Sequence, residues 1–373
     1  MVVGTKPGID QQKETDFLGI KGIDHIEYYA SNAFQTAHFF RTAFGFKPIA
    51  YAGFETKVRD HVSYVVRQRN VRFVFSSSFD PNSLISKHIA EHGDGVKDIA
   101  FKVDDAEKAF NEAVKRGAQP VLEPTVMEDE NGQTIKATIG ICGDFVHSFI
   151  QRDNYEGSFL PGYEPIKNPP LTLSTGLLSV DHMVLCVPSG EIQKWVDHYC
   201  QVLGFINSYN LDVNTHVSGM HYSIVQNKVG SIKLAIVEPI SGTQKSQIQE
   251  FLNYHHGPGI QHVALLTNDM VQTIQSLRGN GIEFLRTPDT YYDVIEDRIG
   301  DVDEDFSTLR DLGILIDRDP QGYLMQIFTK PIQSRPTLFL EIIQRNGTQL
   351  FGHGNIEALF KAVEREQGLR GNL

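Results

Sequence analysis

An internal repeat constrains the fold of this chain more than any other feature of its sequence. Three pairs of segments match in the same order: G-I-K-G-I-D-H at Gly19 with G-L-L-S-V-D-H at Gly176, H-G-D-G-V-K-D at His92 with H-G-P-G-I-Q-H at His256, and V-H-S-F-I-Q-R at Val146 with F-L-E-I-I-Q-R at Phe339. Three matches in one order indicate a duplicated structural module.

Each copy alternates strands and amphipathic helices, which predicts an α+β fold of tandem βαβββ modules. We expect each module to curve into an open barrel around a cavity. A segment rich in glycine and proline, 154–173, separates the copies. The predicted domains are therefore 17–153 and 174–351. Residues 352–373 form a lid helix and tail, with Asn355 as the expected N-cap of that helix.

Composition excludes several classes of protein. The 373 residues carry a net charge of −12, which argues against nucleic acid or an anionic membrane as a partner. No apolar run approaches the length of a membrane span. The three cysteines are too few for a disulfide framework. We expect a cytoplasmic protein with a loose N-terminal arm over residues 1–16.

Three ionisable side chains interrupt apolar strands of the second copy. Glu341 lies inside T-L-F-L-E-I-I-Q, where a carboxylate loses its water and needs a charged, hydrogen-bonding or metal partner. His182 and His262 lie inside two other apolar runs. Two histidines and one carboxylate on three strands are the ligand set of non-haem Fe(II) oxygenases. The sequence therefore predicts an iron site in this copy.

The first copy lacks that ligand set. The equivalent residues of the two copies are His25 and His182, Asp98 and His262, and Ser148 and Glu341. A single histidine in a strand is more often a hydrogen-bonded core residue than a ligand. The coincidence of all three at matched positions favours a metal site in the second copy and a structural role for the first.

Several longer motifs identify a family. They are K-S-Q-I-Q-E-F at Lys245, G-I-Q-H-V-A-L at Gly259, R-P-T-L-F-L-E-I-I-Q-R at Arg335, F-G-H-G-N-I-E-A-L-F at Phe351 and F-L-P-G-Y-E at Phe159. With them the chain resembles, over nearly its whole length, the 4-hydroxyphenylpyruvate dioxygenase family of vicinal-oxygen-chelate (glyoxalase-like) modules. The resemblance implies Fe(II), the same three ligands, O2, and an aromatic 2-oxo acid that loses CO2. It also implies a homo-oligomer.

The resemblance further implies residues around the substrate. The expected catalytic amides are Gln247, Gln261 and Gln326, and the expected substrate contacts are Ser223, Ala235, Val237, Phe351 and Ile356. An amide can orient a phenol or a carboxylate without titrating. Ala235, Val237 and Ile356 depart from the family pattern, which has proline, asparagine and phenylalanine in these places.

These aliphatic replacements favour one product over another. They resemble 4-hydroxymandelate synthase, in which the benzylic carbon is hydroxylated, so the sequence predicts 4-hydroxymandelate. The alternative is a 4-hydroxyphenylpyruvate dioxygenase that forms homogentisate in tyrosine catabolism. A lower alternative is a non-catalytic protein, or one with another substrate, on the same fold.

Overall fold

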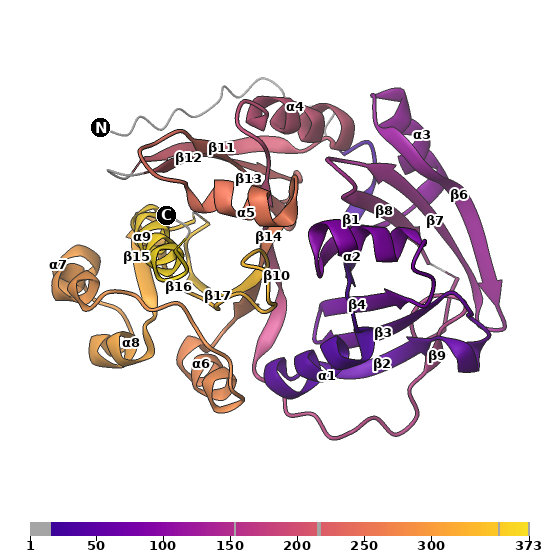
Figure 1. The fold of residues 1–373 in the computed structure, drawn as a ribbon, viewed down its shortest axis with the longest axis horizontal. Coiled ribbons are helices and arrows are strands. Elements are labelled where there is room, and N and C mark those ends of the chain that lie inside the picture. Colours follow the sequence, from indigo (N-terminus) through magenta and orange to yellow (C-terminus); the bar gives the residue numbers. More distant parts are fainter. Residues whose placement is uncertain (1–15, 153, 215–217, 350, 372–373) are drawn as a thin grey trace.

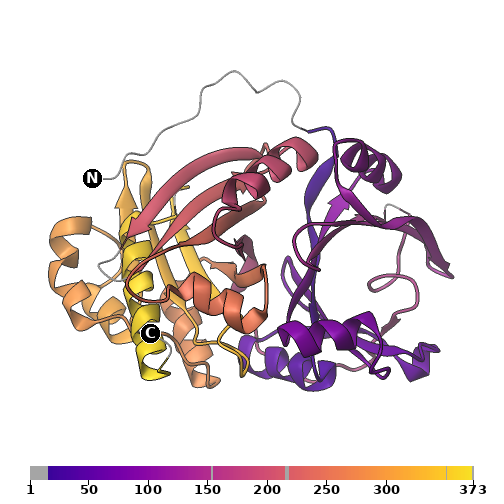
Figure 2. The same cartoon turned by 45° about the horizontal axis from the view of Figure 1, so that its top comes forward.

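The structure, a computed structural model, describes residues 16–152, 154–214, 218–349 and 351–371. Two curved sheets lie side by side, one from each half of the chain, with helices along them (Figures 1 and 2). The predicted α+β class with two modules is confirmed. Most of the expected N-terminal arm, residues 1–15, lies outside the described residues. Within the described parts of the chain, no helix has the length and apolar character needed to cross a lipid bilayer.

The first sheet has the strand order β6-β7-β8-β5-β1-β4-β3-β2-β9. The elements of this half are β1 (Ile20–Tyr29), α1 (Ala33–Phe44), β2 (Lys47–Ala52), β3 (His61–Gln68), β4 (Val71–Ser78), α2 (Leu84–His92), β5 (Gly95–Val103), α3 (Ala106–Lys115), β6 (Gln119–Asp129), β7 (Gly132–Gly140), β8 (Val146–Gln151) and β9 (Glu164–Pro165).

The second sheet has the strand order β11-β12-β13-β10-β14-β17-β16-β15. The elements of this half are β10 (Leu177–Cys186), α4 (Ile192–Leu203), β11 (Ile206–Asn214), β12 (Gly219–Gln226), β13 (Lys233–Ile240), α5 (Gln247–His255), β14 (Gly259–Thr267), α6 (Met270–Gly279), α7 (Ile295–Ile299), α8 (Phe306–Leu312), β15 (Leu315–Asp319), β16 (Gly322–Phe328), β17 (Phe339–Asn346) and α9 (His353–Leu369).

The two halves share one pattern of strand pairing. An antiparallel central pair, β1 with β5 or β10 with β14, is flanked by parallel neighbours on both sides.

Equivalent helices of the two halves begin and end at residues of the same type. Ser83 and Ser246 cap α2 and α5, and each accepts a hydrogen bond from a backbone amide of the first turn. Gly45 and Gly204 end α1 and α4 with φ of 74° and 70°, a conformation that glycine adopts without strain.

The segment that separates the copies in sequence partly belongs to the first sheet. Its residues Glu164 and Pro165 form β9, which pairs with β2. Phe159 and Leu160 are buried in the barrel among residues such as Val74. The first module therefore extends to about Pro165, beyond the boundary at 153 expected from sequence.

The C-terminal helix α9 packs along the second sheet, where it contacts β15 and α5 (Figures 1 and 2). It begins at His353 with Gly352 as its N-cap, whereas the expected N-cap was Asn355, three residues later. Asn355 lies inside the helix and is 1% exposed, so its side chain does not cap the helix.

Candidate metal centre and cavity

Strand register brings the three predicted ligands to one place. On the central strand β14, the Cα of Ala264 pairs with His182 of β10 on one side and with Glu341 of β17 on the other. His262 lies two residues from Ala264 and faces the same side of the sheet, because side chains alternate along a strand. Three neighbouring strands thus point one side chain each into a common space.

The distances within this group suit a metal ion. Nε2 of His182 lies 3.1 Å from Oε2 of Glu341, and Nε2 of His262 lies 3.5 Å from the same oxygen. The three residues are at most 6% exposed. Ala264 is fully buried at the strand position between His182 and Glu341, and its side chain is only a methyl group. Two nitrogens and a carboxylate that converge without filling the centre form a facial ligand set.

Neighbouring side chains hold each imidazole in the orientation that a metal requires. Nδ1 of His182 donates to Asp181 across 2.8 Å, and Arg345 binds both oxygens of that carboxylate. Nδ1 of His262 donates to Gln261 across 3.1 Å. These bonds place the proton on Nδ1 and leave the Nε2 lone pair free for a metal.

The electrostatics of the group call for a cation. Burial alone would raise the pKa of Glu341, but His182 and His262 lower it to about 2. Burial alone would lower the pKa of His182, but the charge of Glu341 and the bond to Asp181 outweigh it and raise that pKa. For His262 burial prevails and lowers the pKa. A carboxylate that stays ionised at 1% exposure is stabilised by a proton on His182 or by a metal.

The triad opens on a cavity that is lined mainly by apolar side chains, as sites for small ligands are. Beyond the triad, its lining residues are the apolar Val184, Met220, Val237, Ile248, Phe328, Phe351, Ile356 and Leu359, the phenol Tyr222, and the amides Gln247, Gln261 and Gln326. An apolar wall with a few polar groups suits an aromatic molecule that carries a polar group at each end.

Two of the expected substrate contacts lie away from the cavity. Ser223 is absent from its lining and donates a hydrogen bond to Asn210 across 2.8 Å. Ala235 is fully buried in the same apolar cluster as Val237 but does not line the cavity. On β12 it is Tyr222 that faces inward. The alternation of Met220, Tyr222 and Ile224, all in one apolar cluster, is the sequence signal that identifies the inward face.

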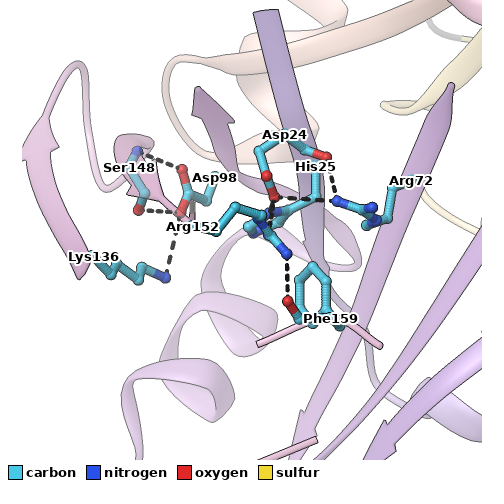
Figure 3. A network of polar contacts seen from close by, with 8 residues as sticks. All are labelled: Asp24, His25, Arg72, Asp98, Lys136, Ser148, Arg152 and Phe159. Carbon is cyan, nitrogen blue, oxygen red and sulfur yellow. Dashed lines mark hydrogen bonds and ion pairs between the residues drawn. The ribbon is translucent and has the colours of Figure 1, made fainter. Parts of the chain in front are cut away.

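The first module keeps the supporting residues of the site and the histidine equivalent to His182, but not the full ligand set (Figure 3). Asp24 accepts from Nδ1 of His25 and from Arg152, as Asp181 does from His182 and Arg345. Asp98, however, is bound by the amide and hydroxyl of Ser148, and the ammonium of Lys136 lies 3.8 Å away. Hydrogen bonds from Ser148 and the charge of Lys136 thus satisfy this carboxylate without a metal.

Comparisons with known proteins agree with this architecture. The family model described as "Hydroxyphenylpyruvate dioxygenase, HPPD, N-terminal" matches residues 15–160, and that of the "Glyoxalase/Bleomycin resistance protein/Dioxygenase superfamily" matches residues 181–297. A 4-hydroxyphenylpyruvate dioxygenase from Danio rerio is 44% identical over 362 residues, 94% of this chain and 91% of the relative. One from Aspergillus fumigatus is 39% identical over 397 residues, 100% of this chain and 98% of the relative.

A solved structure is also similar. A triple mutant of 4-hydroxymandelate synthase from Streptomyces coelicolor superposes with a TM-score of 0.84 and 32% identity, over 94% of this chain and 99% of the other. Fold and site together define an oxygenase of tandem vicinal-oxygen-chelate modules, with a candidate metal centre in the second module. More specifically, the chain belongs to the 4-hydroxyphenylpyruvate dioxygenase family. The predicted family is thereby confirmed.

Proposed function

We propose that this protein oxidises 4-hydroxyphenylpyruvate with O2, releases CO2 and forms homogentisate. The observation that carries the proposal is the buried His182, His262 and Glu341 group at the end of a cavity with apolar walls and amide side chains. Relatives with 39–44% identity named 4-hydroxyphenylpyruvate dioxygenase support homogentisate over the 4-hydroxymandelate favoured by the sequence analysis.

The metal in this proposal is Fe(II), held by His182, His262 and Glu341. When bound, Fe(II) would supply Lewis-acid and redox chemistry for the 2-oxo acid and O2. The protein itself holds the metal-binding side chains in fixed orientations. Asp181 and Gln261 fix the two imidazoles by their Nδ1 protons, which keeps both Nε2 atoms directed at one point.

The cavity walls orient the aromatic ring. Phe351 lies with its ring 4.8 Å from that of His182, so an aromatic wall begins directly beside the proposed ligand set. Gln247 and Gln261 line the cavity and can bind the phenol or the carboxylate of the substrate. Ile356 and Leu359 of α9 close the cavity, and their apolar side chains exclude water from the reacting atoms.

4-Hydroxymandelate remains the second candidate product because of two specific side chains. Val237 and Ile356 line the cavity, and neither can donate the hydrogen bond of an asparagine or present the ring of a phenylalanine. A wall without these groups would leave the ring free to tilt, which would change the carbon that the substrate presents to the triad. Identification of the aromatic product by chromatography, after anaerobic Fe(II) loading and addition of substrate and air, separates the two products.

A third outcome of that assay would support the lower alternative. If the purified protein retained no iron and released no CO2 from 4-hydroxyphenylpyruvate, a non-catalytic protein or another substrate would replace this proposal. The homo-oligomer and the cytoplasmic location expected from the sequence stay predictions. Light scattering of the purified protein and fractionation of the source cells would test them.

A further inference from the structure

A second group of metal-type side chains lies where the two modules meet. His88 and His92 occupy successive turns of α2, and Asp144 lies in the loop between β7 and β8. One ligand atom from each residue lies within 4.8 Å of the other two. Both histidines are buried, at 3% and 6% exposure. Residues four apart on a helix share a face, so both imidazoles are directed toward Asp144.

His92 is oriented as a metal ligand would be. Its Nδ1 donates to the backbone carbonyl of His255 across 2.6 Å, which leaves the Nε2 lone pair unprotonated. That Nε2 lies 3.6 Å from Oδ1 of Asp144. The ring of His255 stacks on that of His92 at 4.5 Å and fixes its plane. A lone pair and a carboxylate that face each other across a small gap favour a cation between them.

His88 is bonded through only one of its nitrogens. Nδ1 lies 2.6 Å from Oδ2 of Asp144, whereas Nε2 is buried and has no hydrogen-bond partner among the described residues. A buried polar atom without a partner is uncommon in folded proteins. For Nδ1 to bind a metal, its proton must move to Nε2 or leave the ring, and Nε2 has no hydrogen bond among the described residues that would oppose this change.

Lys97 is the group that competes with a metal here. Its ammonium lies 3.1 Å from Oδ2 of Asp144 and also donates to the backbone carbonyl of that residue. A cation that binds Asp144 must therefore share or displace this ion pair. The two imidazoles can offset the loss of this ion pair only for ions that bind nitrogen strongly, such as Zn²⁺. Mg²⁺ and Ca²⁺ prefer oxygen ligands.

We propose that His88, His92 and Asp144 form a second divalent-metal site, of the Zn²⁺ type, at the junction of the modules. The ion would join α2 to the loop before β8. Because His92 also bonds the last residue of α5, and α5 begins at Gln247 in the cavity wall, the ion would stiffen the support of that wall. This site uses none of the residues of the proposed iron centre and does not depend on the proposed reaction.

The test counts zinc in the iron-loaded protein. Zn²⁺ is titrated anaerobically against a chromophoric chelator, and iron and zinc are then measured in the same sample. We expect one zinc in addition to the retained iron. His88→Gln and His92→Gln should each weaken zinc binding roughly tenfold or more. The control His38→Gln, an exposed histidine on α1, should bind zinc as the wild type does. Zinc bound only as iron is lost, or equal binding by all three variants, would overturn the proposal.

Two further measurements make the test independent of variant folding. Lys97→Met removes the competing ammonium and should tighten zinc binding, whereas weaker binding by this variant contradicts the assignment. Anomalous diffraction at the zinc edge from wild-type crystals soaked in Zn²⁺ should give a peak between α2 and the β7–β8 loop. A zinc peak at His182 and Glu341 alone would contradict the proposal.

Discussion

The side-chain amide of Gln326 donates a hydrogen bond to Oε1 of Glu341 across 2.8 Å. The carbonyl oxygen of the same amide accepts a bond from Asn355 of α9 at 3.0 Å, and Asn355 in turn accepts one from Tyr291 at 2.7 Å. A continuous chain of hydrogen bonds therefore links the carboxylate of the proposed iron centre to the helix that covers the cavity. The position of α9 and the orientation of Glu341 are coupled through one glutamine.

Removal of this amide should weaken iron binding. In Gln326→Leu, Glu341 loses the donor that orients it and Asn355 loses its acceptor. We expect the affinity for Fe(II) to fall about 10- to 100-fold. Anaerobic competition with a chelator measures the affinity. The control Gln321→Leu, an exposed glutamine between β15 and β16, should bind iron as the wild type does. Unchanged affinity in Gln326→Leu would show that the bond is not needed to orient Glu341.

The small side chain of Ala264 should be essential for the metal. Ala264→Leu places a branched side chain between His182 and Glu341 and should abolish Fe(II) binding, at a cost of about 1–3 kcal/mol in unfolding free energy from overpacking. Ala264→Gly leaves the space open and should retain iron. Metal analysis of the purified variants, with thermal unfolding to confirm that they are folded, compares the two. Retention of iron by Ala264→Leu would mean that the ion does not lie in this space.

The register of β12 predicts opposite effects for two adjacent residues. Tyr222 lines the cavity, so Tyr222→Ala should lower kcat/KM for 4-hydroxyphenylpyruvate by roughly tenfold or more. Ser223 faces away from the cavity and bonds Asn210, so Ser223→Ala should leave kcat/KM close to that of the wild type. Steady-state oxygen uptake measures both variants. The reverse ranking would contradict the register.

Asp24 should contribute stability that depends on pH. Burial alone would raise the pKa of this carboxyl, but the bond from His25 and the charges of Arg152 and Arg72 hold the pKa well below its usual value of 3.8. Since the folded-state pKa is depressed, the contribution is complete above pH 3.8 and is lost as the pH falls through the folded-state value. Loss of a buried ion pair partner costs about 3–5 kcal/mol.

We therefore expect Asp24→Asn to be less stable than the wild type at neutral pH, with a difference that shrinks below pH 3.8. Urea unfolding at a series of pH values measures this difference. The control is Asp104→Asn, because Asp104 is a surface partner of Lys21 with 64% side-chain exposure. Its removal should change stability by less than about 1 kcal/mol. A difference for Asp24→Asn that grew in acid would contradict the assignment.

The repeat allowed the sequence to predict the architecture and the group of three ionisable side chains. His182, His262 and Glu341 are chemically unusual for apolar strands, and the matched copy supplied an internal reference for each. The supporting pair Asp181 and Arg345 was also accessible, because the D-H and Q-R motifs recur in both copies. Their function becomes evident only once β10 and β17 are seen to flank β14.

The remaining differences arise from register and from tertiary contacts. A shift of one residue along β12 turns a side chain to the opposite face of the sheet, which is why Tyr222 and not Ser223 faces the cavity. Asparagine is a common N-cap residue, but the side-chain amide of Asn355 is hydrogen-bonded to Gln326 and Tyr291, two residues that are distant in sequence. A pattern of residues that are neighbours in the sequence does not predict such contacts. The choice of product likewise depends on the tilt of a ring within a cavity.

The most direct test of the proposed function is the identity of the aromatic product. Purified protein is loaded anaerobically with Fe(II) and mixed with 4-hydroxyphenylpyruvate and air, and the products are separated by chromatography while CO2 is measured. We predict homogentisate in an amount equal to the CO2 released. 4-Hydroxymandelate as the main product would contradict this and would assign the control of ring orientation to Val237 and Ile356.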